Sequence, residues 1–127
     1  MKFIRVERFL NQSKEIQEVL RRDWEPEVGD LYYKDGSMNM VMDEAINKEG
    51  LIPLFTEGQL RTLIEDVTGY NVECEYSPEK GYRINLIRIK VVEEHRVGQY
   101  VRSFDELGHD LLISYWKVLC EMIKETF

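Results

Sequence analysis

The sequence predicts an α+β fold, in which a small antiparallel sheet is covered by helices mainly on one face. Segments with the apolar period of amphipathic helices alternate with segments in which every second residue is apolar, as in half-buried strands. The last helical segment is the longest and forms the expected centre of the core. The chain of 127 residues, 43% of them hydrophobic, is expected to be one domain, with residues 1–23 as an N-terminal extension and residues 24–127 as the body.

The N-terminal extension is expected to contain one short helix. Residues 1–10 mix apolar and charged side chains, so they fit either a short helix or an extended arm. Asn11 or Ser13 can cap a helix over residues 14–22. Because this helix has only about three turns, it needs support from tertiary packing.

A β-hairpin is predicted after the helix-breaking segment around Pro26. Residues 31–33 and 38–42 flank an Asp-Gly turn, which is the strongest short hairpin signal. The next extended run, residues 51–55, contains Pro53 and therefore cannot be a central strand.

A second helix and two further strands follow. A capping box at residues 56–59 predicts the start of the helix, and Gly69 predicts its end. Residues 70–76 alternate as a half-buried strand does. The next strand changes parity near Leu86, which indicates either a bulge, the favoured reading, or burial on both faces. Residues 93–98 are expected to form a charged reversal before a last short strand over residues 99–102.

The C-terminal helix is expected to run from Ser103 to Phe127. Ser103 and Glu106 have the spacing of a capping box. One face of the helix carries the main apolar arc, and a second apolar strip is formed by Ile113, Trp116 and Cys120. This second strip requires a partner, which is either the helix over residues 14–22 or a second copy of the chain.

Composition excludes several classes of function. The formal net charge of -7 argues against a nonspecific grip on a nucleic-acid backbone. No apolar run reaches the ~20 residues of a membrane span, and no secretory signal is present, so a cytoplasmic protein without a membrane partner is expected. Cys74 and Cys120 lack metal or redox spacing and are expected to be reduced and buried. Neither His95 nor His109 belongs to a metal motif, and no phosphate loop or nucleophile elbow occurs, so no catalytic residue, metal or cofactor is predicted.

Two surfaces are candidates for binding. The candidate protein interface consists of aromatic, methionine and isoleucine side chains, although the spacing of the hairpin residues also fits a core: Trp24, Tyr32, Tyr33, Met38, Met40, Ile113 and Trp116. The candidate nucleic-acid contact is a basic strand, whose cations could instead pair with Glu73 and Glu75 across a hairpin: Arg83, Arg88 and Lys90.

Three short motifs resemble those of a group of mobile-element proteins. They are a Trp24-x-Pro26-x-x-Gly29-Asp30 segment, a Leu51-x-Pro53 run followed by Gln59-Leu60, and a terminal apolar helix. On these motifs the chain, from Trp24 to its end, resembles short phage- and prophage-encoded proteins of unknown function. The resemblance implies a bacterial cytoplasmic context and transfers no catalytic role.

The sequence therefore predicts a non-enzymatic accessory protein that binds another protein, with a homodimer expected. The alternatives are a module that binds single-stranded nucleic acid through residues 82–90, and an enzyme whose acidic site is assembled from distant residues.

Overall fold

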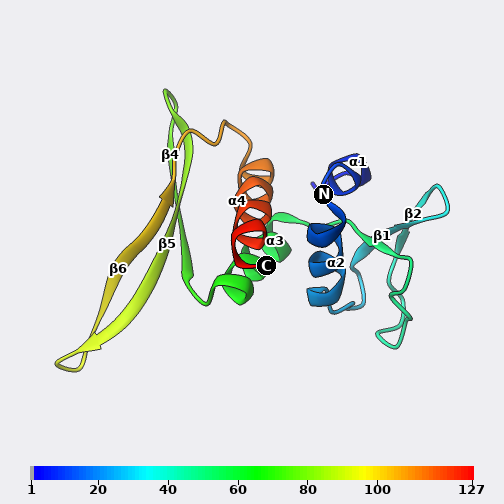
Figure 1. The fold of residues 1–127 in the computed structure, drawn as a ribbon, viewed down its shortest axis with the longest axis horizontal. Helices are drawn as coiled ribbons and strands as arrows, with labels where there is room; N and C mark the ends of the chain where they lie inside the picture. The colour runs from blue at the N-terminus through cyan, green and yellow to red at the C-terminus, as the bar shows by residue number, and fades with distance from the viewer. Residues whose placement is uncertain (1) are drawn as a thin grey trace. The chain divides into compact units, whose positions relative to one another are not determined.

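A computed structural model describes residues 2–127, so Met1 lies outside the described residues. The chain divides into two compact units, the first 56 residues together with Phe127, and residues 57–126. The predicted α+β class is confirmed (Figure 1). The strands form two three-stranded antiparallel sheets, one in each unit, where a single sheet was expected.

The first unit begins with two helices. Helix α1 spans Val6–Leu10, so this part of residues 1–10, which fitted either a helix or an extended arm, is helical. Helix α2 spans Lys14–Asp23 and confirms the predicted short helix. Its N-cap is Ser13, whose side-chain oxygen accepts a hydrogen bond from the amide of Ile16 at 3.3 Å.

The sheet of the first unit has the strand order β2-β1-β3. Strands β1 (Leu31–Lys34) and β2 (Ser37–Met40) are joined by the predicted two-residue turn, in which Asp35 and Gly36 have φ angles of 50° and 81°. Strand β3 (Ile52–Pro53) lies at the edge, as its proline requires.

The second unit contains α3 (Glu57–Thr68), β4 (Asn71–Ser77), β5 (Gly81–Val92), β6 (His95–Phe104) and α4 (Leu111–Thr126). Its sheet has the order β4-β5-β6. Helices α3 and α4 pack against each other and against β4 and β5, on one face of this sheet (Figure 1). The covered face buries Val72, Ile84 and Leu86, which are 4%, 0% and 0% exposed.

A bulge lies near Leu86, but its extra residue is on the neighbouring strand β6, and the prediction of a bulge in β5 itself is wrong. Leu86 pairs with Arg102 and Ile87 pairs with Tyr100, so Val101 on β6 has no counterpart. The bulge places Arg102 on the covered face, where it pairs with Glu125 of α4. It places Tyr100 on the opposite face.

The charged reversal expected over residues 93–98 is wrong. Only Glu93 and Glu94 form the turn, and β5 and β6 extend on either side of it as far as Val92 and His95. Both glutamates have positive φ angles, 49° and 66°, in a region that glycine and asparagine usually occupy. Because this turn contains neither glycine nor asparagine, the sequence lacks the usual signal of a two-residue hairpin turn.

The predicted start of the C-terminal helix at Ser103 is also wrong. Ser103 belongs to β6, opposite Asn85, and the helix begins eight residues later at Leu111. Its first turn is capped by Asp110, whose side chain accepts a hydrogen bond from the amide of Ile113 at 3.1 Å. Gly108 (φ 94°) and Glu106 (φ 53°) break the regular backbone before it.

The second apolar strip of α4 is largely buried in the single chain. Trp116 and Cys120 are 2% and 8% exposed, and Ile113 is half-buried. This strip therefore gives no support to a dimer. Among residues 2–127, no helix combines the length and apolar character that a membrane span requires.

Candidate functional site

The candidate site is the outer face of the β4-β5-β6 sheet, opposite the face that α3 and α4 cover. Strand pairing sets its membership, because side chains of directly paired residues share a face. Glu73 pairs with Asn85, which pairs with Ser103, and two steps further along β5, Ile87 pairs with Tyr100. The remaining members on β5 and β6 are Arg83, Ile89, Val91, Arg96 and Gly98.

A polar cluster around Asn85 occupies the end of this face nearest the β4–β5 turn. Asn85 is only 1% exposed, although no helix covers it. Its amide nitrogen donates to Glu73 and to Glu75, both at 3.3 Å. Its amide oxygen accepts from Ser103 at 2.7 Å and from Arg83 at 3.2 Å. One asparagine therefore holds two carboxylates, a hydroxyl and a guanidinium in fixed positions.

Tyr100 connects this cluster with the apolar part of the outer face. Its hydroxyl donates to Oε1 of Glu73 at 3.0 Å, and this hydrogen bond to a carboxylate raises the pKa of Tyr100. The tyrosine remains 61% exposed, so the contact fixes its hydroxyl and leaves its ring open to solvent.

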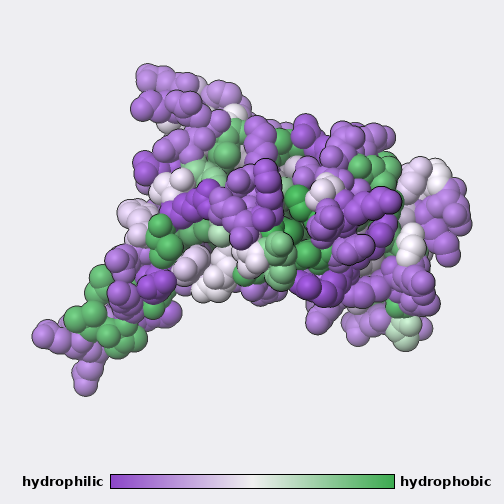
Figure 2. Space-filling model, in the orientation of Figure 1, coloured by the Kyte–Doolittle hydropathy of each residue, from purple (hydrophilic) through white to green (hydrophobic). Residues whose placement is uncertain are grey.

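An apolar strip continues from Tyr100 towards the β5–β6 turn. Ile89 and Val91 are 39% and 73% exposed, and Ile87 is half-buried. Strand β4 pairs with β5 only as far as Ile87, so beyond that residue β5 and β6 pair with each other alone. We call this two-stranded segment, residues 88–99, the ribbon. Figure 2 shows hydrophobic residues gathered on it, surrounded by hydrophilic surface.

The ribbon differs in charge from the acidic protein that carries it. Its strands contain Arg88, Lys90 and Arg96, and the only carboxylates are those of the turn, Glu93 and Glu94. No hydrogen bond or ion pair joins Arg96 to another residue among residues 2–127. The apolar strip therefore ends in an exposed cation at the turn, while its other end meets the carboxylates of the polar cluster.

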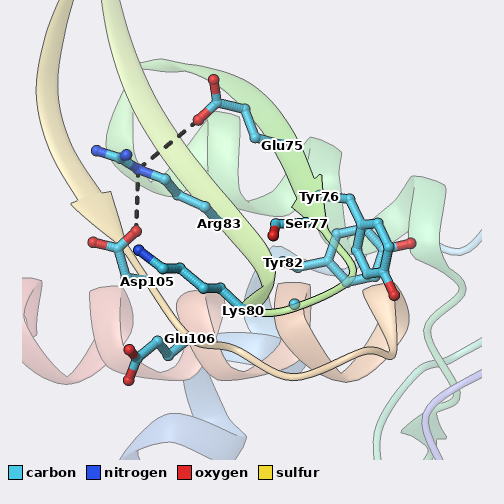
Figure 3. A pocket seen from close by; sticks show the side chains of 9 residues that line it. Glu75, Tyr76, Ser77, Lys80, Tyr82, Arg83, Asp105 and Glu106 are labelled. Atoms are coloured by element: carbon cyan, nitrogen blue, oxygen red, sulfur yellow. Dashed lines mark ion pairs between the residues drawn. The ribbon is translucent and has the colours of Figure 1, made fainter.

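A hollow of about 360 Å³ lies beside the polar cluster, where the β4–β5 turn faces the segment after β6 (Figure 3). In it, Arg83 lies between Asp105 and Glu75, at 3.2 and 3.9 Å. The rings of Tyr76 and Tyr82 lie side by side, with centroids 4.6 Å apart. The rest of the lining comes from Ser77, Lys80, Gly81 and Glu106.

The backbone around this hollow is tightly fixed. The amide of Tyr82 donates to the carbonyl of Gly108 at 2.7 Å, and Leu107 donates back to Tyr82 at 3.1 Å. A Cβ atom on Gly81 would overlap the Gly108 carbonyl, so glycine is required there. The hollow itself offers two cations and three carboxylates, two of which already pair with Arg83.

The three predicted nucleic-acid contacts do not lie on one surface. Arg83 is on the outer face and pairs with Asp105 and Glu75. Arg88 and Lys90 project from the opposite face of the ribbon, where a nitrogen of Arg88 lies 3.4 Å from the hydroxyl of Tyr70. The expected alternative, pairing of a cation with a carboxylate across the hairpin, therefore holds for Arg83.

The methionines of the β1–β2 hairpin are exposed, which contradicts the reading of the hairpin spacing as a core. Met38 and Met40 are 56% and 51% exposed. Met38 and Tyr33 line an apolar hollow of about 340 Å³ together with Phe3, Arg5, Val6, Glu7 and Leu54. Tyr32 and Tyr33 are half-buried.

Two other predicted interface residues are buried within the chain. Trp24 is 4% exposed, and its indole nitrogen donates to Asp30 at 3.2 Å. Trp116 is 2% exposed, and the third, Ile113, is half-buried. These side chains belong to the packed interior more than to a surface.

The cysteines are free, as expected. Cys120 is buried, and burial raises its pKa to about 12. Cys74 was also expected to be buried but is only half-buried, and burial raises its pKa as well. Among residues 2–127, no group of three or more His, Cys, Asp or Glu side chains is arranged to hold a metal ion.

Sequence reasoning missed the outer face of the ribbon. The parity change near Leu86 did not identify Ile89 and Val91 as an exposed face, and Arg96 fell within the reversal expected over residues 93–98. A signal was available, because three apolar residues on β5 continue with the parity of Asn85 beyond the bulge. No protein-family model, curated protein or solved structure matches this chain.

Proposed function

We propose that this chain is a non-enzymatic accessory protein of phage or prophage type that acts in the bacterial cytoplasm by binding another protein chain. The binding surface is the apolar strip of the outer face, Ile89, Val91 and Tyr100. The phage context rests on the resemblance of the motifs between Trp24 and Leu60 and of the terminal helix.

One observation carries the binding proposal: the ribbon exposes an apolar face although it has no third strand. An isolated two-stranded hairpin is marginally stable in water, and exposed apolar patches commonly mark protein interaction sites. Val91 at 73% exposure and Tyr100 at 61% leave a large apolar area uncovered. A protein partner would remove this area from water and stabilise the ribbon.

Photocrosslinking tests the proposal. A photoreactive amino acid in place of Val91 is expected to form a covalent adduct with a protein in the native host. The matched control carries it in place of Val97, a neighbouring valine that is 48% exposed on the opposite face. An additional Ile89→Asp change should abolish the adduct. No adduct from Val91, or equal adducts from both positions, would contradict binding through the outer face.

A second candidate function, binding of single-stranded nucleic acid, is favoured by the common face of Arg88 and Lys90. Both are exposed, and the strand pairing places Gln99 beside Arg88 on the same face. Such a face could contact a phosphate backbone. The net charge of -7 opposes it.

Titration with a single-stranded oligonucleotide at low salt separates this candidate from protein binding. If it is correct, the Arg88→Ala/Lys90→Ala variant should lower the dependence of log affinity on log salt by about 1.4, because two phosphate contacts are lost. The control, Lys80→Ala/Lys124→Ala, removes the same charge elsewhere on the second unit and should have no effect. Absence of binding by the unmodified chain eliminates the candidate.

A further inference from the structure

The outer face has a charge order that makes it complementary to a second copy of itself. Along its length it runs from the polar cluster, where the carboxylates of Glu73 and Glu75 outnumber the cation of Arg83, through the apolar strip, to the cation of Arg96. Arg96 pairs with Val91 and Glu73 pairs with Asn85, so six residues of β5 separate the two charged ends. At ~3.3 Å per residue these ends are ~20 Å apart.

We propose, resting on the proposed protein-binding function, that the partner on the outer face is a second copy of this chain, packed face to face and antiparallel. A two-fold axis midway between the charged ends lies between Ile87 and Ile89. Arg96 lies on β6, whereas Glu73 and Glu75 lie on β4, on the other side of β5. The strands of the two copies therefore cross at an angle, so that Arg96 of each copy lies over Glu73 and Glu75 of the other. Opposite charges then meet at both ends of an interface whose centre is apolar.

The free edge of β6 is a poorer site for self-association. This strand carries His95, Arg96 and Arg102 and has no carboxylate. Antiparallel pairing of two β6 edges would bring cations near cations, which is unfavourable. Packing of the outer faces avoids this repulsion and buries the apolar strip, which edge pairing would leave in water.

Sedimentation equilibrium on the full chain, from ~1 to ~200 μM, tests the proposal in the affinity range expected of a small or partly polar interface. The unmodified chain should form a dimer. Ile89→Lys should raise the dissociation constant at least about tenfold, because it places a cation beside the two-fold axis, in the apolar centre of each copy. Val97→Lys, on the opposite face of the same ribbon, should leave it unchanged.

Charge reversal tests the orientation of the two copies. Arg96→Glu should weaken the dimer, since it sets a carboxylate over Glu73 and Glu75, and a further Glu75→Lys change should restore a large part of the affinity. Circular dichroism establishes that each variant is folded. A dimer that loses affinity equally with Ile89→Lys and Val97→Lys, or that the double change does not restore, would overturn the arrangement.

The crosslinking experiment distinguishes failure of self-association from failure of the proposed protein-binding function. A monomer at all concentrations, together with a Val91 adduct to a different protein, overturns self-association and leaves the proposed function intact. A monomer without any Val91 adduct overturns both. An adduct between two copies of the chain, lost with Ile89→Asp, supports both.

Discussion

At the scale of single residues, Asn85 determines the chemistry of the outer face. It is the one side chain that contacts Glu73, Glu75, Arg83 and Ser103 together. An amide is suited to this position because it donates and accepts at once. A carboxylate there would add a third negative charge, and an apolar side chain would remove the hydrogen bonds that hold these four groups in place.

Replacement of Asn85 should therefore destabilise the fold measurably. Asn85→Ala removes the donor shared by two carboxylates and should lower the free energy of unfolding by about 1 kcal/mol, the net contribution of a hydrogen bond whose partners can still reach water. Urea denaturation followed by circular dichroism measures this change. The control is Asn39→Ala, whose amide donates only to the Ser37 carbonyl at the surface and should matter by less than about 0.5 kcal/mol. Equal effects would show that the cluster contributes nothing of its own.

Because the Cys120 thiol is buried, the folded state should lose stability in alkaline solution. Its pKa is raised by burial to about 12 from an ordinary value of 9.0, so the folded state keeps a proton that the unfolded state releases. The stabilisation is complete below pH 9 and is lost as the pH rises towards 12, with a slope of at most ~1.4 kcal/mol per pH unit.

Thermal or urea unfolding across this pH range, with Cys120→Ala beside the unmodified chain, checks the sign and the slope. The variant should lose stability less steeply between pH 9 and 12. Cys74→Ala should remove a smaller part of the slope, because the Cys74 thiol is only half-buried. An unchanged slope in Cys120→Ala would contradict the linkage.

At the scale of elements, short sequence patterns correctly predicted the turns, helix ends and edge strands that depend only on neighbouring residues. The Asp35–Gly36 turn, the helix that ends before Gly69 and the edge position of Pro53 all agree with the structure. The start of α4 was misplaced because Ser103 and Glu106 have the spacing of a cap, whereas Ser103 is held in β6 by its pairing with Asn85. That pairing is a long-range contact, which a local pattern does not contain.

The position of the α4 cap can be tested directly. Asp110→Ala should lower the free energy of unfolding by about 1 kcal/mol, because the amide of Ile113 loses its side-chain acceptor. Glu106→Ala should have little effect, since Glu106 lies outside the helix. Chemical denaturation of both variants measures the difference. A larger cost for Glu106→Ala than for Asp110→Ala would contradict the observed helix start.

The outer face could be predicted in part. Alternation along residues 70–76 and 82–86 correctly indicated paired strands. The parity change after Leu86 was misread as a bulge in β5, whereas Ile87, Ile89 and Val91 lie on the outer face and the bulge is on β6. The ribbon beyond the bulge was not predicted, because Glu93 and Glu94 form its turn without glycine or asparagine. Three-dimensional pairing is needed to place Arg96 and Tyr100 beside the β5 side chains with which they share a face.

At the scale of the whole molecule, the surface available for a partner differs from the one that the sequence favoured. The apolar strip of α4 is largely satisfied within the chain, since Trp116 and Cys120 are buried. Exposed apolar side chains instead gather on the methionine hairpin of the first unit and on the ribbon of the second. The ribbon is the better candidate for a binding surface, because its two strands pair only with each other and have no further support.

Amide hydrogen exchange over residues 88–92 and 95–99, followed by mass spectrometry at ~200 μM protein, tests the central claim most directly. A two-stranded ribbon without a partner opens readily and exchanges fast, whereas a ribbon covered by a second copy is protected. The account predicts exchange at ~200 μM that is at least about tenfold slower than at ~1 μM, which corresponds to about 1.4 kcal/mol of added stability. Fast exchange of the ribbon, equal at both concentrations, would contradict it.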